Sequence, residues 1–231
     1  MTAPVAKPPA AKPAAAKTSA TKKPPREVRV TGAKFIASVS GIGEVPPGMA
    51  EFAMCGRSNV GKSSLINALC NQKQLARVSK TPGRTQRINL FDVDLSSGQT
   101  IRLVDLPGFG HADVPGAVQR QFSPMIQAYL LEQPALRAVL LLVDARRDPD
   151  PDAIGFAEWL SENHVPVVLI VTKSDKVPKT ERFGVQEKLR RAFGQADRPL
   201  LCSSQVGDGM PDLLRFLRDA AGHLPRAKKS R

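Results

Sequence analysis

The chain has 231 residues and is 42% hydrophobic, which suits one folded domain with a full core and short appendages. No apolar run approaches the roughly 20 residues that span a bilayer, and no apolar stretch near the N-terminus is typical of a secretory signal. Cys55, Cys70 and Cys202 form no CxxC pair and show no metal-ligand spacing with the histidines. We therefore expect reduced cysteines in a cytoplasmic protein without a membrane anchor.

The formal charge of +13 is concentrated at the two ends of the chain. Residues 1–26 hold six Lys or Arg and residues 226–231 hold four, with no acid in either segment. Residues 1–26 are almost entirely Ala, Lys, Pro, Thr and Ser, a composition typical of disorder. We expect two basic tails flanking a folded domain at residues 27–225. The tails either attract a polyanion such as nucleic acid or only keep the protein soluble.

From about residue 51 the chain alternates strand signals with helix signals. The expected strands are 51–55, 87–95, 100–104, 138–143, 165–171 and 199–202, and the expected helices are 63–70, 151–163, 179–193 and 211–221. Ser96-Ser97-Gly98 predicts a hairpin-like turn, and the runs at 138–143 and 165–171 are wholly apolar, as in strands buried on both faces. This order predicts an α/β fold with three α/β/α layers, in which the sheet is mostly parallel with one antiparallel edge strand.

A phosphate-binding loop is predicted where the first of these strands meets the first helix. The segment matches G-x-x-x-x-G-K-S and consists of Gly56, Arg57, Ser58, Asn59, Val60, Gly61, Lys62 and Ser63. Its glycines let successive N–H groups point at phosphate oxygens, and the following helix adds its positive end. Lys62 would reach the β- and γ-phosphates, and the Ser63 hydroxyl would bind Mg²⁺. The pattern favours a P-loop NTPase fold but does not show which base the bound nucleotide carries.

Two further segments indicate guanine. The first follows a buried strand in a T-K-x-D pattern and consists of Thr172, Lys173, Ser174 and Asp175. The single carboxylate of Asp175 can accept hydrogen bonds from both the N1–H and the N2 amine of guanine. Adenine would leave that carboxylate desolvated and unpaired. The stem of Lys173 can lie along the base plane. After the next strand, a backbone N–H of Cys202, Ser203 or Ser204 can donate to guanine O6, although this pair of serines equally suits a helix start.

Two loops are predicted to respond to the γ-phosphate. Asp105, Leu106, Pro107 and Gly108 end a strand, so that Asp105 can hold Mg²⁺ through a water and the Gly108 N–H can approach the γ-phosphate. In the polar loop 79–86, Thr85 is preferred to Thr81 for completing the Mg²⁺ shell. Loss of the γ-phosphate would release both loops. The predicted catalytic residues are Lys62, Thr85 and Gly108.

With these motifs in order, residues from about 31 to 224 resemble the EngB (YihA/YsxC) family of bacterial ribosome-assembly GTPases. The matching stretches are GRSNVGKSSLINAL, TPGRTQRINLF, DLPGFG and TKSDK. The resemblance implies GTP and Mg²⁺ binding, a role in maturation of the large ribosomal subunit, and a requirement in cell division and septation. It places the Mg²⁺ ligands on Ser63 and Thr85, and it makes Gly83, Arg84, Thr85, Gln86 and Arg87 a switch segment that contacts nucleotide.

The chain departs from the family at three positions. Phe109 and His111 stand where the family often has Tyr, and Ser174 stands where it often has Ala. A Gln after DxxG orients the attacking water in Ras-type GTPases, and Phe109 cannot do so, which predicts slow intrinsic hydrolysis. In related GTPases an Asn at the position of Asn59 helps to bind K⁺ beside the phosphates. Our hypothesis is K⁺-stimulated hydrolysis. His111, three residues after Gly108, is more readily explained as a solvent-exposed loop residue than as a functional one.

Three classes of function remain after this reading. The first is a monomeric assembly GTPase that docks on the large ribosomal subunit or its RNA. The second is a regulatory GTPase that acts on a protein or membrane target, and the absence of a prenylation cysteine or acylation signal disfavours the membrane. The third is a metabolic kinase with a phosphate loop, against which Asp175 argues.

Overall fold

The computed structural model describes residues 27–76, 87–109 and 124–222. The expectations for the two tails, for Gly83, Arg84, Thr85 and Gln86, and for His111 therefore lie outside the described residues.

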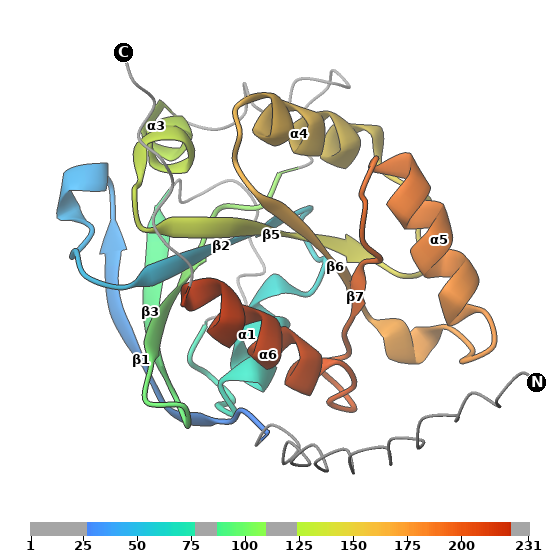
Figure 1. Ribbon diagram of the computed structural model, residues 1–231, viewed down its shortest axis with the longest axis horizontal. Coiled ribbons are helices and arrows are strands. Elements are labelled where there is room, and N and C mark those ends of the chain that lie inside the picture. The colour runs from blue at the N-terminus through green and yellow to red at the C-terminus, as the bar shows by residue number, and fades with distance from the viewer. Residues whose placement is uncertain (1–26, 77–86, 110–123, 223–231) are drawn as a thin grey trace, which may run out of the picture.

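The described strands form one seven-stranded sheet in the order β1-β3-β4-β2-β5-β6-β7 (Figure 1). Their bounds are β1 Val30–Val39, β2 Ala50–Gly56, β3 Ile88–Leu95, β4 Thr100–Asp105, β5 Leu136–Asp144, β6 Val167–Thr172 and β7 Leu200–Leu201. The five strands from β4 to β7 run parallel, whereas β3 is antiparallel to both β4 and β1. The mostly parallel sheet is confirmed, with its antiparallel pairing at one edge. β1 had not been expected, and it lies outside β3 as the outermost strand.

Helices cover both faces of the sheet, which confirms the three layers (Figure 1). The helices are α1 Lys62–Leu69, α3 Pro124–Glu132, α4 Pro151–Glu162, α5 Arg182–Ala192 and α6 Met210–Ala221, with short 3-10 turns at Ile42–Glu44 and Ser174–Lys176. Buried side chains of α3, α4 and α5 share one core cluster, and those of α1 and α6 share the other. Trp159 of α4 packs against the first cluster and stacks on Phe156, as expected for a packing residue. No helix within these ranges is long and apolar enough to cross a bilayer.

A buried network of charged and polar side chains joins the strands near the amino end of β2. Arg102 of β4 is 1% exposed, and its Nε and Nη2 donate to the two carboxylate oxygens of Asp92 at 2.7 and 3.2 Å. Arg102 Nη1 lies 3.4 Å from Oε1 of Glu51, and the Tyr129 hydroxyl donates to Glu51 Oε2 at 2.9 Å. Burial raises the pKa of Glu51, a shift that these hydrogen bonds oppose. The network ties β2, β3 and β4 to α3.

The predicted ligand-binding segments follow the carboxyl ends of parallel strands. The phosphate loop follows β2, Asp105 ends β4, Thr172 ends β6, and Cys202 follows β7. Because these ends meet at one edge of the sheet, the fold gathers four segments that are far apart in the sequence.

Candidate nucleotide-binding site

The phosphate loop connects β2, which ends at Gly56, to α1, which begins at Lys62. A Cβ on Gly56 would lie 2.8 Å from the carbonyl oxygen of Leu142, so only glycine fits there. Asn59 has φ +65° and Gly61 has φ +105°, and this left-handed backbone turns the chain tightly into the helix. The tight turn that the motif predicts between strand and helix is therefore present in the fold.

Lys62 and Asp105 lie together at the centre of the site. The Lys62 ammonium is ion-paired with Asp105 Oδ1, and the two side chains are 14% and 11% exposed. Ser63 follows Lys62 in the first turn of α1. The pair thus joins the phosphate loop to the predicted Mg²⁺-binding segment. The hydroxyl of Ser63 and the carboxylate of Asp105 are oxygen donors of the kind that Mg²⁺ prefers, so these residues fit that ion.

The segment after Asp105 is hydrogen-bonded to the phosphate loop. The Ser58 N–H donates to Phe109 O at 3.0 Å, and the Phe109 N–H donates to Gly56 O at 3.2 Å. A Cβ on Gly108 would lie 3.2 Å from Gly56 O and 3.4 Å from Ser58 N, so the close approach favours glycine. The Phe109 ring is 2% exposed and lies 5.8 Å from the ring of Phe156. Its burial agrees with the expectation that this side chain does not orient a water.

Thr172 and Lys173 hold the phosphate loop from the other side. The buried Thr172 hydroxyl lies 2.7 Å from Val60 O and 3.1 Å from Val143 O. Lys173 has φ +58°, and its Nζ donates to Asn59 O at 2.8 Å. Its stem passes close to the loop, because a Cβ on Gly61 would lie 3.7 Å from Lys173 Cε. Both predicted residues therefore connect the base-recognition segment to the phosphate loop.

Asp175 is oriented by the loop after β7. The Ser203 hydroxyl donates to Asp175 Oδ1 at 2.6 Å, and Lys176 Nζ lies 3.1 Å from Oδ2. The Ser203 hydrogen bond, with a smaller contribution from Lys176, lowers the pKa of Asp175. A carboxylate that stays ionised suits the two donors on guanine. The sequence pattern suggested proximity of the two loops but not this hydrogen bond.

Backbone hydrogen bonds join the other members of these two segments. The side chains of Ser174 and Cys202 are buried, and the Ser174 N–H donates to Cys202 O at 3.2 Å. The Ser203 N–H donates to Asp208 O at 2.9 Å, so it is not available to a base. The Ser204 N–H makes no hydrogen bond to another described residue. The Cys202 N–H donates to Val171 O at 2.7 Å, so of the three predicted donors only the Ser204 N–H is without a partner among the described residues.

Asp144 was not among the site residues predicted from the sequence. It ends β5 and is 6% exposed, and it accepts hydrogen bonds from Lys173 Nζ at 2.9 Å and from Arg146 Nε and Nη2 at 2.9 and 2.7 Å. Burial alone would raise the pKa of Asp144, but the hydrogen bonds from Arg146 and Lys173 outweigh it and lower this pKa. An acid directly after a wholly apolar strand, at the edge where the other motifs lie, was the signal that could have revealed it.

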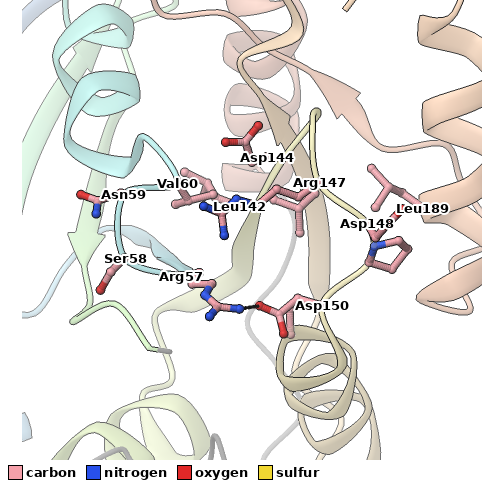
Figure 2. Close-up of a pocket in the computed structure, with 13 residues that line it drawn as sticks. Arg57, Ser58, Asn59, Val60, Leu142, Asp144, Arg147, Asp148, Asp150 and Leu189 are labelled. Carbon is pink, nitrogen blue, oxygen red and sulfur yellow. Dashed lines mark hydrogen bonds and ion pairs between the residues drawn. The ribbon is translucent and has the colours of Figure 1, made fainter. Parts of the chain in front are cut away.

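Arg57, assigned to the phosphate loop, extends toward α4 rather than along the loop (Figure 2). Its Nη1 lies 2.7 Å from Oδ2 of Asp150, the N-cap residue of α4. Arg87 is the one member of the predicted segment 83–87 that the structure describes, and it is exposed at the start of β3.

Comparison with known proteins agrees with this geometry. Residues 51–173 match a family described as "50S ribosome-binding GTPase". The chain is 41% identical over 196 residues to the probable GTP-binding protein EngB of Syntrophus aciditrophicus, which covers 84% of this chain and 98% of that protein. This chain belongs to the EngB family of GTP-binding proteins.

Other relatives agree. The probable EngB of Geotalea daltonii is 50% identical over 157 residues, covering 68% of this chain and 73% of its own. A crystal structure of a probable EngB matches the fold with a TM-score of 0.57 at 24% identity, over 74% of this chain and 98% of that chain. As an EngB-family protein with a P-loop fold, the chain is a GTPase that binds GTP and GDP, and the family typically uses Mg²⁺.

Proposed function

We propose that the gathered segments form the GTP site and assign their roles as follows. The loop from Gly56 to Ser63 holds the phosphates, with Lys62 on the β- and γ-phosphates. Ser63 and Thr85 would hold Mg²⁺ directly, and Asp105 would hold it through a water. Asp175 reads the guanine edge, with Lys173 along the base. The observation that carries this proposal is the set of bonds that join the segments to one another, Lys62 to Asp105, Lys173 to Asn59 and Asp175 to Ser203.

Bound Mg²⁺ would supply charge neutralisation for phosphoryl transfer, and the protein would position the groups around it. Gly108 lies against the phosphate loop, which supports the assignment of its N–H to the γ-phosphate. Hydrolysis to GDP would remove that contact and release the segment that begins at Asp105. We infer a slow intrinsic rate, because Phe109 replaces the water-orienting Gln and its ring is buried. K⁺ held with the help of Asn59 would supply additional positive charge.

We further propose that the GTP form docks on the large ribosomal subunit or its RNA during assembly, and that this step is needed for normal cell division and septation. The description of the matched family supports the ribosomal target. The basic segments 1–26 and 226–231 would add electrostatic attraction to RNA. On this account the protein works in the bacterial cytoplasm as a monomer. The alternative is a regulatory GTPase with a protein or membrane target.

Co-sedimentation of the full chain with purified ribosomal subunits tests the docking proposal. The protein should sediment with the large subunit in the presence of a non-hydrolysable GTP analogue and be released with GDP. Deletion of residues 1–26 should weaken this association while leaving GTP affinity unchanged. Absence of the full chain from the large-subunit fraction with either nucleotide would favour the alternative target.

A further inference from the structure

Four successive residues of the phosphate loop are held by three different parts of the chain. The Ser58 N–H bonds to Phe109 O, Asn59 O accepts from Lys173, and Val60 O lies within hydrogen-bond distance of the Thr172 hydroxyl. These three contacts come from segments already assigned to nucleotide binding. The fourth contact is the Arg57–Asp150 ion pair, and it comes from the start of α4, which has no such role.

The side of the loop that faces α4 lacks close packing. A pocket separates the loop from the connection between β5 and α4, and the Arg57–Asp150 ion pair reaches across it (Figure 2). Its lining includes Val60, Leu142, Pro149 and Leu189. Since side chains do not fill this space, the Arg57–Asp150 ion pair is a direct side-chain link between the loop and the start of α4 on this side.

Asp150 is itself fixed in position. Its Oδ1 accepts from the Asp152 N–H at 3.1 Å as the N-cap of α4, which leaves Oδ2 for Arg57 at 2.7 Å. Its side chain is 20% exposed and that of Arg57 is 45% exposed. α4 also carries Phe156, whose ring lies 5.8 Å from that of Phe109, the residue after the 105–108 segment. The helix that restrains the loop is therefore anchored beside the nucleotide site at a second point.

We propose that Arg57 and Asp150 form a positioning pair that holds the phosphate loop in its nucleotide-binding shape. This inference rests on the proposed nucleotide site. A loop that is ordered before binding loses less conformational freedom when the phosphates arrive. The restraint acts on the loop backbone, so it favours GDP and GTP alike and leaves the chemical step unchanged.

Asp150→Asn separates this role from the helix cap. Asparagine is as good an N-cap as aspartate, so α4 keeps its start while Arg57 loses a charged partner. Asp148→Asn is the matched control, because Asp148 lies two residues earlier and pairs with Lys188 at 2.5 Å rather than with the phosphate loop. Titration with fluorescent GDP measures the affinity of five full-length proteins. They are the wild type, Asp150→Asn, Asp148→Asn, Arg57→Gln and the double variant Arg57→Gln/Asp150→Asn.

We expect Asp150→Asn and Arg57→Gln each to weaken GDP binding roughly two- to fivefold, the range of a partly exposed ion pair. The double variant should bind no more weakly than either single variant, and Asp148→Asn should bind like wild type. In steady-state GTP hydrolysis the KM should rise in the same proportion with kcat unchanged, as for a contact made equally in ground and transition states.

Three outcomes would each overturn the proposed positioning role. They are additive losses of affinity in the double variant, equal GDP affinity of Asp150→Asn and Asp148→Asn, and a fall in kcat at constant KM. Failure of the wild type to bind GDP would instead refute the proposed nucleotide site, so the two failures are distinguishable. Equal urea midpoints for Asp150→Asn and Asp148→Asn would confirm that the loss of affinity is not a loss of fold.

Discussion

The Ser203 hydroxyl donates a 2.6 Å hydrogen bond to Asp175 Oδ1, although the two residues are 28 positions apart. The bond lowers the pKa of Asp175 and fixes the direction of its carboxylate. Ser203→Ala should therefore weaken GDP binding roughly tenfold, the cost of losing a hydrogen bond to a charged group. Calorimetric titration with GDP measures this, with the exposed Gln205→Ala as control. Equal affinity of the two variants would show that Asp175 needs no support from Ser203.

The buried network around Arg102 should govern stability rather than nucleotide binding. Arg102→Leu would leave the carboxylates of Asp92 and Glu51 buried without their cation. Removal of one partner of a buried pair typically costs about 3–5 kcal/mol in free energy of unfolding. Urea denaturation followed by circular dichroism measures the loss. A variant as stable as wild type would mean that the two carboxyls are protonated or solvated in the fold.

Asp144 should make stability depend on pH. Its pKa is lower in the folded protein because the hydrogen bonds from Arg146 and Lys173 outweigh the effect of burial. Such a group stabilises the fold fully above its unfolded pKa of about 3.9, and this contribution is lost as pH falls through the folded pKa. Asp144→Asn should therefore be less stable than wild type at pH 7, and the difference should shrink below about pH 4. Urea midpoints at pH 7, 4 and 3 check this, and a constant difference would contradict it.

Asn59 should determine the response to monovalent cations. If it helps to hold K⁺ beside the phosphates, wild-type hydrolysis should be faster in KCl than in NaCl, and Asn59→Ala should remove the difference. Rates of phosphate release at matched ionic strength, with ribosomal particles present, measure the effect. Equal wild-type rates in the two salts would exclude K⁺ stimulation.

Most elements after residue 51 were predictable because their patterns are local. The strand expected at 138–143 is β5 and the helix expected at 151–163 is α4, each within a few residues. Their apolar runs and periodicity follow from burial. β1 was not expected because Gly32 and Lys34 interrupt its apolar pattern, and α3 was not expected either.

The site was predictable where a short motif carries its chemistry. Such motifs predicted the phosphate loop, Asp105 and Asp175 as site residues, and the fold brings their segments to one edge of the sheet. Asp150 was not, because its pairing with Arg57 spans 93 positions and depends on how α4 packs. The direction of the Arg57 side chain likewise follows from tertiary structure rather than from the motif.

The measurement that tests the guanine site most directly is the base preference of Asp175→Asn. An amide at this position can accept from N1–H of xanthine and donate to its C2 carbonyl, whereas the amine of guanine would oppose the amide donor. Titrations of wild type and variant with GDP and XDP should show wild type preferring GDP and Asp175→Asn preferring XDP. An unchanged preference for GDP in the variant would contradict the assignment of Asp175 as the residue that reads the base.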